Sequence, residues 1–325
     1  MKKSQVMISS SPHIRSKHTT SHIMRDVLIA LVPACFCAIL FFGIRALCLM
    51  LVSVSACICF EFLWQKLTGQ SVRIKDGSAA VTGLLLALNL PPTAPWWMTI
   101  IGAFVAIIIT KELFGGIGSN FMNPALAGRV FLSVSWPLLM SGFTEPFSGG
   151  LFGATDVISS ATPLAILKSG EDLTRLPALS QMFFGNIAGC IGETSALALL
   201  LGGLYLIGRR VISVRIPLAY LGSVALLTWF FGKPGMDPAT AVFYQLFSGG
   251  LMLGAFFMAT DYVTSPVTPF GQILMGIGCG LLTFFIRRFG GYAEGVSYAI
   301  LLMNVVTPLI DTWCHEKPYG HKKNA

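Results

Sequence analysis

The chain contains apolar runs that are too long for the core of a soluble domain. A helix that crosses the hydrocarbon layer of a membrane needs about 20 apolar residues, because every backbone N–H and C=O must be paired within it. Long runs occupy residues 26–43, 46–65, 96–110, 195–208, 216–231, 270–286 and 296–311, and shorter runs, broken by Gly or flanked by Pro, occupy 78–90, 124–140 and 245–258. The sequence therefore predicts an all-α polytopic membrane protein with about ten transmembrane segments.

Composition and charge agree with a membrane location. Charged residues make up 11% of the chain and the mean hydropathy is +0.74, whereas a soluble domain carries charge on about a quarter of its residues. A net charge of +8 would indicate nucleic acid in a soluble protein. Here Lys and Arg gather in alternate connections, as in the cytoplasmic loops of membrane proteins, and we expect the lipid bilayer and no nucleic acid as a partner.

The same charge distribution predicts the orientation of the chain. It favours a multi-pass protein of the bacterial inner membrane with both termini in the cytoplasm, and the pair Arg287–Arg288 is the local exception. We expect a cytoplasmic N-terminal segment at 1–25, without a cleavable signal peptide. The other regions are a first membrane repeat at 26–140, a periplasmic loop at 141–181, a second membrane repeat at 182–313 and a cytoplasmic tail at 314–325.

The two membrane regions share a short pattern. Pro92 and Pro95 precede Phe114-Gly115-Gly116 and Asn123 in the first, and Pro266 and Pro269 precede Phe289-Gly290-Gly291 and Asn304 in the second. The common order and similar spacing favour a duplication. Because each half holds an odd number of predicted segments, the second copy would run inverted through the membrane. Inverted repeats with broken helices are how many transport proteins build a site at the midplane.

The 141–181 loop is long and rich in Ser, Thr and Gly, and loops of this length usually have a function. Within it, residues 156–164 read DVISSATPL. This segment resembles the D-x-x-[ST]-x-A-T-P-L flavinylation motif in the D subunit of the Rnf ion-translocating electron-transport complex, called Rsx in some bacteria, and in its relative, the B subunit of the sodium-pumping NADH:quinone reductase. The resemblance continues through DGSAAVTGLLLALNLPP at 76–92, KELFGGIGSNFMNPALAGR at 111–129, GETS at 192–195, ATDYVTSPVTP at 259–269 and GGYAEGVSYAILLMN at 290–304.

The resemblance implies a membrane flavoprotein. In that family FMN is attached through its phosphate to the hydroxyl of the motif threonine, which here is Thr162, and a flavin transferase forms the bond. Asp156, Ser159 and Ser160 belong to the same cofactor-binding segment. The implied partners are the other subunits of the Rnf/Rsx complex. Several members also carry a second, non-covalent riboflavin between the repeats.

The residues alone leave a second interpretation of Thr162 open. Thr162 is also suited to be the N-cap of a helix, with Pro163 at the first helical position. The small neighbours Ser160 and Ala161 leave room for a modifying enzyme, and Pro163 favours an extended conformation at Thr162. Thr155 is a similar but poorer acceptor, because Asp156 and not Pro-Leu follows it.

Several polar residues fall within or beside the apolar segments, where an unpaired charge is costly. We take Asp76, Asp261, Asn123 and Arg129 as candidates for binding the coupling cation or the second flavin, with Arg129 also suited to pair with a carboxylate. Further polar residues in these segments are Glu61, Lys111, Glu112, Glu193, Asn89, Asn186 and Asn304. The cysteines lack C-x-x-C spacing, so we expect them to pack as small apolar residues, with no metal site.

Three functions fit the composition and topology. The first is a redox subunit that relays electrons through FMN, coupled to translocation of Na⁺ or H⁺. The second is a secondary transporter without a redox cofactor, and the third is a structural scaffold. The 156–164 motif favours the first, because a transporter does not need a modifiable threonine. Without a G-x-G-x-x-G turn we expect no NADH site, no catalytic residue of its own, and one subunit of a translocase rather than a complete enzyme.

Overall fold

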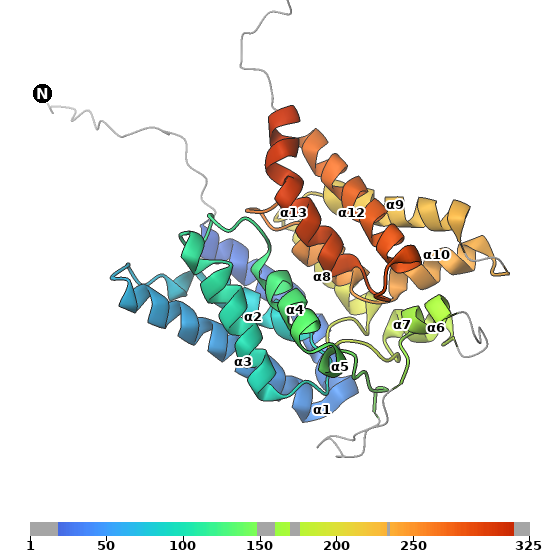
Figure 1. The fold of residues 1–325 in the computed structure, drawn as a ribbon, viewed down its shortest axis with the longest axis horizontal. Coiled ribbons are helices and arrows are strands. Elements are labelled where there is room, and N and C mark those ends of the chain that lie inside the picture. Colours follow the sequence, from blue (N-terminus) through green and yellow to red (C-terminus); the bar gives the residue numbers. More distant parts are fainter. Residues whose placement is uncertain (1–18, 148–159, 170–175, 233–234, 315–325) are drawn as a thin grey trace, which may run out of the picture.

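The computed structural model describes residues 19–147, 160–169, 176–232 and 235–314, which form helices and connections and no strand (Figure 1). The all-α prediction is confirmed for this part of the chain. The elements are α1 (Thr20–Leu67), η1 (Ile74–Asp76), α2 (Ser78–Leu88), α3 (Trp96–Phe104), η2 (Val105–Ile109), η3 (Glu112–Phe114), α4 (Pro124–Ser135), α5 (Pro137–Met140), α6 (Pro163–Ser169), α7 (Leu179–Phe184), α8 (Ala196–Gly208), α9 (Arg215–Phe231), α10 (Pro238–Phe247), α11 (Leu251–Leu253), η5 (Gly254–Met258), α12 (Pro269–Phe289) and α13 (Val296–Trp313).

Several of these helices are membrane helices by length and composition. Within the described residues, four are long and apolar enough to cross a membrane, and a fifth span results if α10 and the α11–η5 helix, bent by 67°, count as one. The shorter apolar helices α2, α8 and α9 accompany them. The ten-segment arrangement in two inverted repeats stays a prediction.

Helix α1 is too long for one crossing. Its 48 residues would extend roughly 70 Å as a straight helix, against about 30 Å of hydrocarbon. It breaks at Gly43, whose φ of 68° is strained for residues with a Cβ. The hydroxyl of Ser21, at the start of α1, donates to the carbonyl O of Lys75, beyond its end, at 3.4 Å. The helix therefore folds back on itself (Figure 1), and its halves correspond to the predicted runs 26–43 and 46–65.

Helix α8 packs closely against α1 through a glycine. A Cβ built on Gly202 would lie 2.1 Å from the carbonyl O of Ala30, and one on Gly203 would lie 2.5 Å from the ring of Phe256. Small residues at such positions let membrane helices approach until their backbones are in contact.

We expect Gly202→Ala to destabilise the protein by about 1–3 kcal/mol, the usual cost of overpacking, because the new methyl group would meet a backbone carbonyl. Gly208→Ala, in the same helix, is the matched control, since a Cβ there has nothing within 4 Å. Thermal unfolding of the detergent-purified variants measures the difference. Similar melting temperatures for the two variants would contradict the packing at Gly202.

The repeated sequence strings occupy similar places in the two halves, which lie side by side (Figure 1). Pro95 is the N-cap of α3 and Pro269 begins α12. The two Phe-Gly-Gly strings lie at the ends of the apolar segments that begin at these prolines, at the end of η3 in the first half and of α12 in the second. The two asparagines are not equivalent, however, because Asn123 is the N-cap of α4 whereas Asn304 lies inside α13.

Part of the 141–181 region is helical. Helix α6 lies within it, and α7 crosses the predicted boundary at 181. The backbone N–H of Ser160 donates to the carbonyl O of Phe143 at 2.9 Å. Lys168, on α6, donates to the carbonyl oxygens of Gly290 and Tyr292. These bonds hold α6 against the connection between α12 and α13, and α6 lines two of the cavities described below.

Candidate functional site

A cavity of about 320 Å³ lies beside Thr162, between α4, α6 and the connections before α8 and α13. Its size is within the range of about 300–1,000 Å³ that is typical of small-molecule sites. The polar and aromatic residues that line it include Arg129, Ser160, Thr162, Glu193, Tyr292, Glu294, Ser297 and Tyr298.

Thr162 caps the helix that follows it. Its Oγ accepts a hydrogen bond from the backbone N–H of Ala165 at 3.3 Å, and Pro163 is the first helical residue. The N-cap interpretation is therefore confirmed, while flavinylation of Thr162 stays a prediction. Ser160 also lines the cavity, and its buried Oγ has no hydrogen-bond partner. Thr155, Asp156 and Ser159 lie outside the described residues.

Arg129 lies at the inner wall of the cavity and is only 7% exposed. Its Nη1 donates to Asn89 Oδ1 at 2.8 Å and to Ser297 Oγ at 3.0 Å. Its Nη2 donates to the carboxylate of Glu294, and Nη1 lies 3.1 Å from Glu193 Oε1. The prediction that Arg129 pairs with a carboxylate is confirmed. A buried charge needs such compensation, because taking it out of water costs several kcal/mol.

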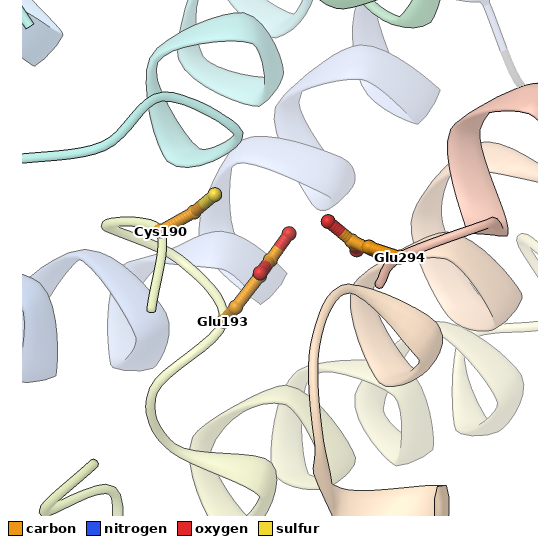
Figure 2. Close-up of side chains that lie close together, drawn as sticks. All are labelled: Cys190, Glu193 and Glu294. Carbon is orange, nitrogen blue, oxygen red and sulfur yellow. The ribbon is translucent and has the colours of Figure 1, made fainter. Parts of the chain in front are cut away.

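Cys190 lies beside Arg129 and its two acidic partners. We name these four residues, Arg129, Cys190, Glu193 and Glu294, the Arg129 cluster. The side chains of Cys190, Glu193 and Glu294 point toward one another (Figure 2), and their ligand atoms lie within 4.8 Å. A sulfur and two carboxylates so close together could hold a metal ion. However, Arg129 Nη2 is also 3.5 Å from Cys190 Sγ, and the guanidinium already supplies one positive charge that both acids share. We interpret the cluster as an ion-pair network.

Sequence reasoning missed four of the residues that line the cavity. Tyr292, Glu294, Ser297 and Tyr298 all belong to the GGYAEGVSY string at 290–298, whose only signal was the family resemblance. The rings of Tyr292 and Tyr298 stack with centroids 5.2 Å apart and planes 21° apart. Cys190 was expected to pack as a small apolar residue, and it is buried, but beside charges.

A smaller cavity of about 100 Å³ lies toward the other end of the helices. Asn123, Asp261, Lys111 and Ser78 are among the residues that line it. Asp261 accepts a hydrogen bond from the Thr264 hydroxyl at 3.3 Å. Two of the four candidates for the coupling cation or second flavin, Asn123 and Asp261, therefore share this cavity.

Asp76 is placed differently from Asn123 and Asp261. Its Oδ1 accepts from the backbone N–H and the hydroxyl of Ser78, at 2.9 and 2.8 Å, at the start of α2. Ser78 Oγ in turn accepts from Lys111 Nζ at 2.7 Å, and Lys111 forms an ion pair with Glu61 at 2.8 Å. Lys111 and Glu112 are each 3% exposed. Both side chains are thus buried within the protein.

Buried polar side chains connect the two cavities. Asn123, which lines the smaller one, donates from Nδ2 to the carbonyl O of Met258 at 3.3 Å. Asn89 donates to Met258 Sδ at 3.6 Å and accepts from Arg129, which lines the larger cavity. Asn186, by contrast, lies apart from this line and is exposed.

Comparison with known proteins identifies the family. A model of the NQR2, RnfD, RnfE family matches residues 7–320. The chain belongs to this family. It is 50% identical, over 99% of its own length and 98% of the relative's, to the D subunit of the Na(+)-translocating ferredoxin:NAD(+) oxidoreductase complex of Acetobacterium woodii.

Two further family members have similar names. The chain is 44% identical, over 99% of its length and 98% of the relative's, to the D subunit of the proton-translocating ferredoxin:NAD(+) oxidoreductase complex of Clostridium ljungdahlii. It is 39% identical, over 97% of its length and 99% of the relative's, to the D subunit of the ion-translocating oxidoreductase complex of Escherichia coli. The resemblance inferred from the sequence motifs is thus confirmed at the level of the family.

Proposed function

We propose that this chain is the flavin-bearing subunit of an ion-translocating oxidoreductase complex, with FMN attached through a phosphoester to Thr162. The relatives support it, since each is named as the D subunit of such a complex. The observation that carries the proposal is that Thr162 borders a cavity of about 320 Å³ with unpaired buried polar groups. The other subunits and a flavin transferase are the partners this function requires.

The residues around the cavity fit a flavin. Ser160 Oγ and Tyr298 Oη are buried without hydrogen-bond partners, and both line the cavity, where they suit the carbonyl and nitrogen atoms of the isoalloxazine ring. The Tyr292–Tyr298 pair offers an aromatic surface for stacking. Flavin supplies one- and two-electron transfer, while the protein sets its position and potential.

Capping and flavinylation by Thr162 are compatible. The Thr162 Oγ accepts the hydrogen bond from Ala165 and does not donate in it. Formation of a phosphoester replaces the hydroxyl hydrogen and leaves an oxygen lone pair for the N–H of Ala165. The same side chain can therefore hold the start of α6 in place and carry the cofactor.

The connection between the cavities supports coupling of electron transfer to cation movement. The cavity that Asp261 and Asn123 line, about 100 Å³, is small against the roughly 300 Å³ of ordinary organic-ligand sites. This size favours the coupling cation there over a second flavin such as riboflavin. The relatives include both a Na⁺- and a proton-translocating complex.

Mass spectrometry of the peptide that contains residues 156–168 tests the proposed function. Protein purified from its native host should show this peptide heavier by one FMN less one water. A peptide of unmodified mass, from protein isolated within an active complex, would contradict the proposal and favour a transporter or scaffold.

We also expect the Thr162 cavity to face the periplasm, because the Lys and Arg distribution places both termini in the cytoplasm. Ser141 lines the Thr162 cavity, Arg210 follows the C-terminal end of α8, and both are exposed, so each can be replaced by cysteine. A membrane-impermeant maleimide should label Ser141→Cys in intact cells, and Arg210→Cys only after permeabilisation. The unsubstituted chain gives the baseline, and the reverse pattern would overturn the orientation.

A further inference from the structure

A third cavity, of about 280 Å³, lies on the other side of α6 from Thr162. Leu164 and Ala293 line both cavities. The cations Lys168, Arg287 and Arg288 line the third cavity, and none of its described lining residues is an acid. It contains the Arg287–Arg288 pair, the exception in the charge distribution. We name it the Arg287 cavity.

Arg287 is only 6% exposed. Its Nη1 donates to the carbonyl O and the Oε1 of Gln245, at 2.7 and 2.8 Å, and its Nη2 donates to the carbonyl O of Ser248 at 3.1 Å. These partners are neutral. The carboxylate of Glu294 is bound instead to Arg129 and to the backbone N–H of Gly250. Among the described residues, the Arg287 guanidinium therefore donates to neutral acceptors and forms no ion pair, although Glu294 lies near it.

Two polar atoms of this cavity lack partners. Arg287 Nε and Thr228 Oγ are both buried without a hydrogen bond, and both residues line the cavity. A buried donor without an acceptor costs about 1–3 kcal/mol, and more if it is charged. A guanidinium N–H and a hydroxyl beside a second cation, Arg288, are the groups that bind phosphate oxygens.

The residues around the cavity indicate which kind of molecule carries such a phosphate. The walls of the cavity include Leu167, Phe231 and Phe284. Phe231 ends α9 and is 62% exposed, and Phe289 ends α12 and is 76% exposed. Both helices are apolar, and α12 meets the length of a membrane span. The cavity thus lies at a helix end, where the headgroup of a lipid meets cationic side chains and its acyl chains meet apolar ones.

We propose that the Arg287 cavity binds the phosphate of an anionic phospholipid and that the bound lipid supports α6. Lys168 already bonds α6 to the Gly290–Tyr292 backbone, so a phosphate in the cavity would pack against a helix whose other face borders the Thr162 cavity. The proposal depends on the cations and unpaired atoms of this cavity and holds whether or not Thr162 carries flavin.

Native mass spectrometry of the detergent-purified full chain tests the proposal, with phosphatidylglycerol and phosphatidylcholine added at equal concentrations. Phosphatidylglycerol should bind about tenfold more tightly, because choline would add a positive charge to a cationic cavity. Thr228→Val and Arg288→Gln should each weaken its binding about tenfold, the loss expected for one charge-assisted hydrogen bond. The matched control is Arg210→Gln, which removes an exposed cation at the other end of the protein. This variant should bind phosphatidylglycerol as tightly as the unsubstituted chain does.

A purely structural role of Thr228 gives a different result. Without lipid, Thr228→Val should melt at the same or a higher temperature, because it removes an unpaired buried hydroxyl. Equal binding of the two lipids, or equal losses in Arg288→Gln and Arg210→Gln, would overturn the proposal. Displacement of the lipid by equimolar inorganic phosphate would show that the cavity takes a free anion, and the lipid assignment would be wrong.

Discussion

Thr162→Ala should abolish covalent flavin, because no other atom of the side chain can form the phosphoester. The protein should lose its fluorescent band on a denaturing gel under ultraviolet light. Thr155→Ala should keep the band, since Thr155 is not followed by Pro-Leu. If the Thr155 variant loses its fluorescence and the Thr162 variant keeps it, the flavin is attached to Thr155 and not to Thr162.

Two more variants separate flavin attachment from helix capping. Thr162→Ala also removes the cap of α6, at a cost of about 0.5–2 kcal/mol. Thr162→Asn keeps a good capping side chain but has no hydroxyl, so it should fold normally and stay dark. Thr162→Ser keeps both the cap and the hydroxyl, so it should retain flavin. Fluorescence in the Asn variant would exclude attachment at this position.

Arg129→Gln should destabilise the protein by about 3–5 kcal/mol, the range for removing one partner of a buried ion pair. It would leave Glu193 and Glu294, which both form ion pairs with the guanidinium, without positive charge. Arg129→Lys should restore little, because an ammonium group cannot bond in the planar, bidentate manner of Arg. Thermal unfolding in detergent measures both variants.

The triple variant Arg129→Gln, Glu193→Gln, Glu294→Gln is the control for charge. Because it removes both acids together with the cation, it should be more stable than Arg129→Gln alone, although the groups are in contact and their effects are not additive. If the triple variant is the less stable, hydrogen bonding and packing outweigh charge in the Arg129 cluster.

The helices were predictable because the membrane restricts the backbone so strongly. Each long apolar run has to pair its own N–H and C=O groups, so the runs at 26–43 and 46–65 became the two halves of α1, with Gly43 at the break. The run at 245–258 was placed less well. Helix α10 begins at Pro238, and Gly249, with φ of 65°, separates it from α11. The two π turns, η2 and η5, had no local signal in the sequence, and such turns are rare.

The candidate site was likewise predictable only in part. Capping by Thr162 was predictable since it depends on residues 162–165 alone. Pairing of Arg129 with some carboxylate was predictable from the cost of an intramembrane charge. The identity of the partner was not, because Glu294 is 165 residues away in sequence and tertiary packing alone brings it close. The unpaired atoms of Ser160 and Tyr298 likewise become visible once the cavity walls are assembled.

The Arg129 cluster also affects how the chain is synthesised. Arg129 and Glu294 are 165 residues apart, so at about 5–20 residues per second the ribosome makes the second on the order of ten seconds after the first. During this interval the first half has entered the membrane with an arginine whose main partner does not yet exist. Until then, Asn89 in the first half and water or lipid headgroups are the groups that can bond to that charge. We therefore expect the first half to reach its final packing only when translation is almost complete.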